Sequence, residues 1–296
     1  MLHDLGGLLV QLDGDIPDPR ADVLVRTGDG SDTDLCRIHR QFGWVGGGEA
    51  TVERLAGAVE ANPLAARALG GVLRATEALP VAEGLVVESL AYSMLLAGPE
   101  FGAWLERRGA RTPPPAGDEA VLLDRQGDVL TITLNRPARH NAYAAAVRDA
   151  LVDALEVALA DPSLLVVVRG AGRSFCSGGD LDEFGTTPDV ATAHVIRTTR
   201  SAGRLLHELG GRLTIEVHGA CIGAGTELAA FGARVVARPE TFFQLPEVAM
   251  GLVPGAGGTV SVTKRIGRHR TAWLALTGER LDLDTALAWG LVDDRC

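Results

Sequence analysis

The amino-acid sequence predicts an α/β protein, and three observations carry this prediction. Short Val-rich apolar runs alternate with longer segments of helical periodicity through most of residues 119–296. Two of these apolar runs lead directly into glycine-rich turns, at residues 170–181 and 218–228. Residues 49–108 show only helical periodicity. We therefore expect a mainly helical region to precede an α/β core.

The core region is expected to contain short strands and medium-length helices. The run at 164–168 is apolar on both faces, which is typical of a buried parallel strand. The expected strands are Val121–Asp124, Val129–Leu134 (joined to the first by a turn at Gln126-Gly127), Leu164–Val168, Leu213–Val217, Val235–Val236 and Phe242–Phe243. The expected helices are Ala142–Ala160, Val190–Leu209, Gly225–Phe231, Ala256–Ile266, Arg270–Leu276 and Asp284–Trp289.

The N-terminal region, residues 1–111, is joined to the core at 119–296 by a proline- and glycine-rich linker at 112–118. One of its helices is predicted with Asn62 as its N-cap and Pro63 at the first helical position. The expected helices are Val52–Val59, Pro63–Leu79, Ala82–Leu96 and Glu100–Arg107, and short strands are expected at Leu8–Val10 and Val23–Val25.

Composition and charge exclude several classes of function. The 296 residues carry a formal net charge of −10 without a basic stripe, so phosphates of duplex nucleic acid would be repelled. No apolar run reaches the roughly 20 residues of a membrane helix, and the N-terminus is acidic where a signal peptide is basic. We expect a cytoplasmic protein that binds neither nucleic acid nor membrane. Cys36, Cys176, Cys221 and Cys296 are scattered, which predicts buried free thiols and neither a metal site nor a disulfide.

Two glycine-rich segments follow predicted buried strands. Residues 170–181 and 218–228 consist mainly of small residues, which let a ligand approach backbone N–H groups closely. The second also opens a helix, whose free N–H groups favour negative charge. Neither contains G-K-[ST], and Leu228 stands where G-x-G-x-x-G requires its third glycine, so nucleotide-binding loops are excluded. Ordinary turns remain an alternative for each segment alone.

A third segment, residues 242–259, contains Glu247 among apolar neighbours just after a proline. A carboxyl group in such a setting tends to have a raised pKa, which suits general acid–base catalysis. A solvated turn residue is the alternative for Glu247. For Glu227, in the second segment, the alternative is a first-turn glutamate favoured by the helix dipole.

Together, these segments resemble the enoyl-CoA hydratase/isomerase family, also called the crotonase superfamily. The resemblance runs without a gap from residue 119 to 295. It rests on Ile132-Thr133-Leu134-Asn135-Arg136-Pro137 with Asn141-Ala142, Ser177-Gly178-Gly179-Asp180-Leu181, Gly219-x-x-x-Gly223-x-Gly225-x-Glu227-Leu228, Pro246-Glu247-x-x-x-Gly251-x-x-Pro254-Gly255-x-Gly257-Gly258-Thr259 and Ala286-x-x-x-Gly290-Leu291-Val292-Asp293. It implies a ββα spiral core with an α-helical cap.

The resemblance implies an acyl-CoA substrate and no cofactor beyond the coenzyme A of that substrate. The family holds the thioester carbonyl between two backbone N–H groups, an oxyanion hole that stabilises an enolate. The matching donors are Gly179 and Ala224, where the family usually has glycine in place of the alanine. A backbone amide remains a donor in alanine. The positions matched to substrate binding are Ala138, Gly178, Gly179, Asp180, Leu181, Asp182 and Gly223.

The resemblance also implies that Glu227 and Glu247 are the catalytic carboxylates of a hydratase. Two neighbouring carboxylates push their pKa values apart, so one serves as acid and the other as base. We expect Glu247 to deliver the proton to the α-carbon and Glu227 to activate water. Related isomerases often keep only the glutamate matched by Glu247. Isomerisation, biosynthetic dehydration, thioester hydrolysis and a non-catalytic scaffold remain alternatives.

The N-terminal helices are where the chain departs from the family. The family continues beyond the Gly-Leu-Val-Asp signature with helices, whereas this chain stops at Cys296. Residues 60–68 resemble the family's late A-x-x-P-x-A-x-x-x-x-K helix, and residues 84–96 and 101–108 resemble its terminal helices. We therefore expect a circular permutation that places the family's C-terminal cap first, with Arg107 or Arg108 near the CoA phosphates. An unrelated helical extension and the remnant of a tandem copy are the alternatives. The family also implies a homotrimer or homohexamer.

Overall fold

The computed structural model describes residues 2–6, 8–12, 18–25, 45, 48–112 and 119–296. Its largest sheet has six strands in the order β12-β9-β7-β6-β5-β4. These strands are β4 (Val121–Gln126), β5 (Val129–Leu134), β6 (Leu165–Gly170), β7 (Leu213–Val217), β9 (Arg234–Ala237) and β12 (Asp294–Arg295). Only β4 runs antiparallel to its neighbour, as half of a hairpin that turns at Gly127 (φ +61°); the remaining pairs are parallel.

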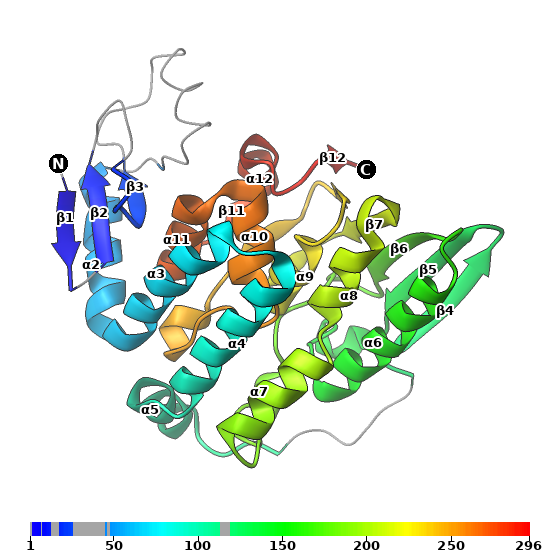
Figure 1. Cartoon of the computed structure of the whole chain (residues 1–296), viewed down its shortest axis with the longest axis horizontal. Helices are drawn as coiled ribbons and strands as arrows, with labels where there is room; N and C mark the ends of the chain where they lie inside the picture. The colour runs from blue at the N-terminus through cyan, green and yellow to red at the C-terminus, as the bar shows by residue number, and fades with distance from the viewer. Residues whose placement is uncertain (1, 7, 13–17, 26–44, 46–47, 113–118) are drawn as a thin grey trace.

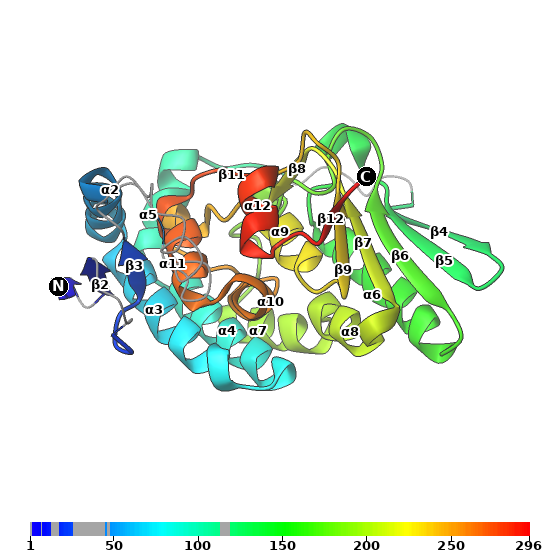
Figure 2. The same ribbon diagram turned by 90° about the horizontal axis from the view of Figure 1, so that it is seen from above.

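A second, three-stranded sheet lies beside the first, in the order β11-β10-β8. Its strands are β8 (Ala220–Ile222), β10 (Phe242–Gln244) and β11 (Leu281–Asp282). Figure 2 shows this short sheet above helices α9 (Ala224–Ala229) and α12 (Leu283–Trp289) and next to the large one. Since only two residues separate the end of β7 from the start of β8, the chain passes directly from one sheet to the other. The loop and helix that follow β8 therefore lie where the two sheets meet.

Helices cover one face of the large sheet (Figure 1). Alternation along β5 directs Leu130, Ile132 and Leu134 into the core, where the inner face of α6 meets them. The core helices are α6 (Ala145–Ala160), α7 (Val190–Thr199), α8 (Ala202–Leu209), α9 (Ala224–Ala229), α10 (Gly258–Ile266), α11 (Arg268–Thr277) and α12 (Leu283–Trp289). Short 3-10 turns lie at η1 (Pro137–Arg139), η2 (Leu181–Glu183), η3 (Gly210–Arg212) and η4 (Glu247–Met250).

The N-terminal region contains the predicted helices and a small sheet. Its helices are α2 (Gly48–Ala61), α3 (Pro63–Ala78), α4 (Val81–Leu96) and α5 (Pro99–Arg108), and its strands, in sheet order, are β1 (Leu2–Leu5), β2 (Leu8–Leu12) and β3 (Val23–Val25). Strand β1 is an addition to the two strands that the sequence predicted. None of the described helices is by itself long and apolar enough to cross a membrane; the bent pair α4–α5 meets that criterion in length and composition only.

The N-terminal helices pack directly on the core. Helices α3 and α4 contact α10, α2 and α3 contact α11, and α4 lies along α7 (Figure 1). The hydroxyl of Thr76 on α3 donates to the carbonyl of Thr259 at 2.9 Å. On α4, Gly84 lies so near to Val260 that a Cβ at residue 84 would stand 2.9 Å from a Val260 methyl. The two regions share one apolar interior.

Three details differ from the sequence predictions or lie beyond them. The single helix predicted at 190–209 is two helices, because the Ser201 side chain accepts a hydrogen bond from Arg204 N at 3.3 Å and starts α8. Asn62 precedes α3 without a side-chain capping bond, and its backbone carbonyl instead accepts from Ala66. The linker residues 113–118 and Cys36 lie outside the described residues.

Candidate functional site

The two glycine-rich segments lie side by side because one follows β6 and the other follows β7, which are neighbouring parallel strands. Cys176 and Cys221 form a parallel bridge, with Ile222 N donating to the Cys176 carbonyl at 3.1 Å. Both cysteines are buried free thiols, whereas Cys296 is exposed. Gly179 and Ala224 each follow a bridged cysteine by three residues. The sequence-predicted oxyanion donors thus lie at equivalent positions after the bridged cysteines, Gly179 in a loop and Ala224 at the start of α9.

Two glycines shape the backbone around these donors. Gly178 has φ +94° and Gly223 has φ +49°, conformations that favour glycine. A Cβ at residue 178 would stand 2.9 Å from the Ile222 carbonyl oxygen, and one at residue 223 would collide with Oε1 of Glu247. In the described part of the chain, neither Gly179 N nor Ala224 N donates a hydrogen bond to a protein acceptor. The two N–H groups are therefore able to bind an oxygen of a ligand.

Glu227 is buried on α9, in the first turn of that six-residue helix. Its Oε2 accepts hydrogen bonds from Ala256 N at 2.7 Å and from Gly258 N at 2.8 Å. Burial raises the pKa of the Glu227 carboxyl to about 7, while these two hydrogen bonds act in the opposite direction. The carboxyl group thus changes its charge near neutral pH. A first-turn glutamate that only interacts with the dipole of a solvated helix would not require this property.

Glu247 is also buried, at the start of the 3-10 turn η4, and is not a solvated turn residue. Burial raises its pKa well above the usual 4.5, and the charge of Glu227 raises it further. Among the described residues, no group donates to or accepts from its Oε2. Because Gly223 faces Oε1 of Glu247 and immediately precedes Ala224, this carboxyl group lies beside one of the two free amides.

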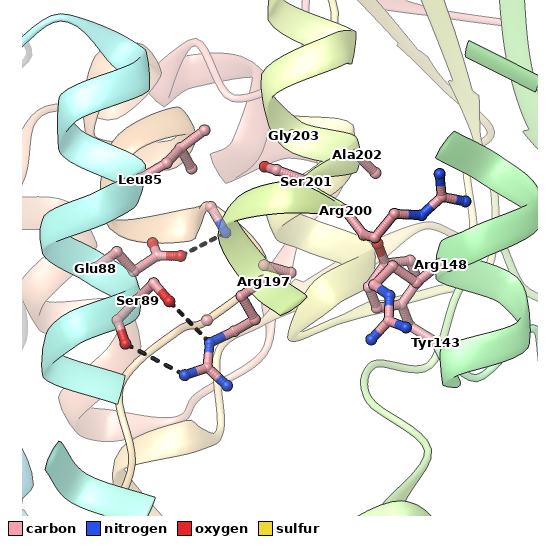
Figure 3. Close-up of a pocket in the computed structure, with 13 residues that line it drawn as sticks. Leu85, Glu88, Ser89, Tyr143, Arg148, Arg197, Arg200, Ser201, Ala202 and Gly203 are labelled. Carbon is pink, nitrogen blue, oxygen red and sulfur yellow. Dashed lines mark hydrogen bonds between the residues drawn. The ribbon is translucent and has the colours of Figure 1, made fainter. Parts of the chain in front are cut away.

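A third buried carboxyl group, Glu88, comes from α4 in the N-terminal region. Its Oε1 accepts from Gly257 N at 2.7 Å (Figure 3), and its Oε2 accepts from Thr259 N at 2.9 Å and from the Thr259 hydroxyl at 2.7 Å. The four successive N–H groups of residues 256–259 thus alternate between Glu227 and Glu88. Burial and the charge of Glu227 raise the pKa of Glu88 to about 8. The two regions of the chain therefore hold the same backbone segment through coupled carboxyl groups.

Sequence reasoning missed Glu88, although a signal was present. It is the sole charged residue between Gly84 and Leu96, a stretch that is otherwise mainly apolar. A lone charge in such a stretch is seldom buried without a partner. Its partners, however, are backbone groups of the segment 256–259, which lies about 170 positions away in the chain. Only the packing of α4 on α10 brings them together.

The other predicted substrate-binding residues have mixed surroundings. Asp180 is buried and pairs with Arg136 and Arg139 at 3.1 and 2.7 Å, which indicates a role in holding the loop. Asp182 pairs with Arg139 and, at 2.8 Å, with Arg108 of α5, so this arginine already has an anionic partner. Leu181 is 41% exposed. Ala138 is also exposed, on η1.

Comparison with known proteins agrees with this geometry. A family model described as enoyl-CoA hydratase/isomerase matches residues 124–296. The chain belongs to this family. It is 38% identical to the 2,3-dehydroadipyl-CoA hydratase of Escherichia coli (strain K12), over 59% of the chain and 68% of that protein. It is 33% identical to the 1,2-epoxyphenylacetyl-CoA isomerase of the same organism, with the same coverage.

Solved structures of enoyl-CoA hydratases share the fold of this chain. The enoyl-CoA hydratase of Mycobacterium smegmatis superposes with a TM-score of 0.55 at 30% identity, over 60% of this chain and 69% of that one. The enoyl-CoA hydratase of Thermoplasma volcanium GSS1 gives a TM-score of 0.56 at 29% identity, over 60% and 72%. The predicted α/β crotonase-like fold is confirmed. The protein is an enzyme of the hydratase or isomerase type.

Proposed function

We propose that the protein is an enoyl-CoA hydratase, which adds water across, or removes it to form, the α,β double bond of an acyl-CoA thioester. The observation that carries this proposal is a pair of buried carboxyl groups with raised pKa values near Ala224: Glu227 is in the same first turn of α9, and Glu247 faces the preceding Gly223. Two carboxyl groups are needed when a base must deprotonate water and an acid must protonate carbon.

The environments of the two glutamates support a division of roles. Glu247, with its pKa well above the usual range, retains a proton that it can deliver to the α-carbon. Glu227, with a pKa near 7, is available as the base that takes a proton from the attacking water. As the water oxygen bonds to the β-carbon, negative charge moves to the thioester oxygen. The Gly179 and Ala224 N–H groups would stabilise that charge.

The test is the hydration of a trans-2-enoyl-CoA by the purified chain and its Glu227→Gln and Glu247→Gln variants. Each substitution keeps the side-chain shape but removes the titrating group, so we expect kcat to fall by roughly 10²–10⁴-fold. The exposed Glu240→Gln variant is the matched control. An isomerase would instead convert a 3-enoyl-CoA, and its activity would survive Glu227→Gln. Absence of turnover with either substrate would contradict the proposal.

We propose further that α2–α5 are the family's helical cap in a circularly permuted position. The support is their contact with α10 and α11, together with the bond pattern at residues 256–259. The family model matches from residue 124 onward, so α2–α5 lie outside the matched segment. From an unrelated helical extension, we would not expect a carboxyl group bound to the same backbone segment that holds Glu227.

We propose a homotrimer or homohexamer as the assembly. Helix α4 exposes an apolar stripe with i, i+4, i+8 spacing, formed by Val86, Leu90 and Met94 with 41%, 53% and 59% exposure. Contiguous exposed apolar side chains commonly mark an interface. Sedimentation is expected to give three or six times 31.0 kDa. Leu90→Asp combined with Met94→Asp is expected to lower the mass, and a wild-type chain that sediments only as a monomer would contradict the proposal.

A further inference from the structure

A cavity of about 50 Å³ lies between α4, the α7–α8 corner and the segment 255–257. A buried water needs roughly 10–15 Å³ measured in this way, so the cavity has room for about four atoms of water size. That is the size of a carboxyl group with one neighbouring carbon. Figure 3 shows the Arg197 guanidinium beside Ser89 in its wall, with Arg148 and Arg200 at the opposite side.

Two walls of the cavity are formed by backbone segments that also contact the proposed catalytic groups. Ala256 and Gly257 line it, and their N–H groups belong to the segment that binds Glu227 and Glu88. Tyr143 lines it from another side, and its backbone bonds to Gly178 O at 2.7 Å and Asp180 N at 3.2 Å, on both sides of Gly179. The cavity therefore shares its walls with the backbone segments that position Gly179 and hold Glu227.

Arg197 is a half-buried cation without an ion pair among the residues that the structure describes. Its Nε donates to the Ser89 hydroxyl at 3.1 Å, and its Nη2 donates to the Ser89 carbonyl and the Ser93 hydroxyl. The guanidinium also lies 4.7 Å from the centre of the Tyr92 ring. Burial lowers the pKa of Arg197. A half-buried cation is stabilised by an anion that reaches it.

The other charged groups around the cavity do not supply that anion. Arg148 and Arg200 both pair with Asp149 at 2.9 and 3.3 Å, and Asp149 is not in the cavity wall. Glu88 is in the wall and its charge acts on Arg197, but its two oxygens bind Gly257 and Thr259 and form no ion pair with that guanidinium. The cavity therefore holds a guanidinium without an ion pair to any described residue, with room for a small anionic group.

We propose that this cavity binds a carboxylate at the far end of the acyl chain, with Arg197 as the residue that selects it. This inference rests on the proposed action on acyl-CoA thioesters and narrows the substrate class to dicarboxylic acyl-CoA. Nε and Nη2 of Arg197 donate to Ser89 and Ser93, which leaves Nη1 to donate charge-assisted hydrogen bonds that a methyl end cannot accept. Such bonds contribute about 1.5–3 kcal/mol, which corresponds to a preference of roughly tenfold to a hundredfold.

The experiment compares two substrates of equal chain length that differ only at the far end, 2,3-dehydroadipyl-CoA and trans-2-hexenoyl-CoA. For the full-length protein we expect kcat/KM to favour the carboxylate substrate by about tenfold to a hundredfold. In Arg197→Met, the ratio of the two kcat/KM values is expected to fall to about one, mainly through KM. Arg204→Met is the matched control, because Arg204 pairs with Glu208 on α8 and does not line the cavity.

Each outcome separates the inference from the proposed function. Turnover of both substrates without preference, or a preference that survives Arg197→Met, overturns the inference and leaves the hydratase proposal intact. If neither substrate is turned over, the hydratase proposal fails, and binding of adipyl-CoA and hexanoyl-CoA by calorimetry decides the inference. Arg197-dependent preference for adipyl-CoA then supports the cavity's role, and equal binding overturns it. Should Arg197→Met fail to fold, Arg197→Lys is expected to give an intermediate ratio, and an unchanged ratio contradicts the inference.

Discussion

The core and the N-terminal helices contribute different chemistry to one site. The core supplies backbone amides at Gly179 and Ala224 and the carboxyl groups of Glu227 and Glu247. The N-terminal helix α4 supplies Glu88, which holds Gly257 and Thr259, and the serine oxygens that orient Arg197. The core motifs are recognisable in sequence because they are local. The contribution of α4 depends on contacts between residues far apart in the chain.

The comparison predicts that the core cannot fold without the helices, and this is the largest effect expected. Removing residues 1–110 uncovers Thr259 and Val260 on α10 and leaves the N–H groups of Gly257 and Thr259 without acceptors. Each lost hydrogen bond costs about 0.5–1.5 kcal/mol, in addition to the lost apolar burial. We expect an insoluble or inactive core without a cooperative thermal transition.

The permuted-cap proposal can be separated from a general loss of stability. A chain in which residues 48–111 are joined by a flexible linker after residue 296 keeps the same helices in a different order. If the cap is a permuted element, this rearranged chain is expected to fold and to recover activity. A truncated core that is soluble and fully active would contradict the proposal, as would a rearranged chain that stays unfolded.

Glu88→Gln is expected to change how stability depends on pH. The pKa of Glu88 is about 8 in the folded chain against 4.5 for an ordinary glutamate, so the folded state binds this proton more tightly. Its contribution is fully present below about pH 4.5 and is lost as the pH rises through 8, by on the order of a few kcal/mol. Urea unfolding at pH 5, 7 and 9 should give a flatter profile for Glu88→Gln than for wild type.

The control for this titration is Glu83→Gln, one turn earlier on α4 and exposed to solvent. Its profile should follow that of the wild type. Parallel profiles for wild type and Glu88→Gln would mean that Glu88 does not titrate in this range, and the coupling between the two regions through Glu88 and Glu227 would be wrong.

Gly84→Ala tests the close approach of α4 to α10 and should have an intermediate effect. The added methyl would meet a Val260 methyl at 2.9 Å, and overpacking of this kind typically costs about 1–3 kcal/mol. Gly71→Ala on neighbouring α3 is the control, since nothing lies within 4 Å of its Cβ position; there, helix propensity should raise stability by about 0.5–1 kcal/mol. Equal shifts in Tm would show that α4 and α10 are not in tight contact.

The smallest effect is expected for the ion pair between Arg54 on α2 and Glu279 in the core. Both side chains are substantially exposed, at 51% and 33%, and such pairs contribute about 0–1 kcal/mol. Arg54→Met should therefore lower the free energy of unfolding by less than 1 kcal/mol, with a smaller difference at high salt. A larger loss would indicate that charge, rather than apolar packing, joins the two regions.

The sequence by itself determined most of the secondary structure and the position of the core motifs. The strand at 213–217 and the hairpin strand at 129–134 occur at the predicted residues, because alternation and turn glycines are local properties. The helix predicted at 190–209 divides at Ser201, since the apolar pattern continues across a capping residue. The two glutamates and the two amides were located by their motifs, which stay within a few residues of each other.

Only the tertiary structure decided which groups share the site. The alternation of Glu227 and Glu88 along residues 256–259 needs α4 to pack on α10, and no spacing in the sequence encodes that distance. The same holds for Arg197. Its place in the helical pattern of α7 predicts an ordinary surface residue, and only the packed chain brings Ser89 and Ser93 of α4 into contact with it. Burial sets the pKa of a carboxyl group and the counter-charge that an arginine requires, and burial is a property of the packed chain.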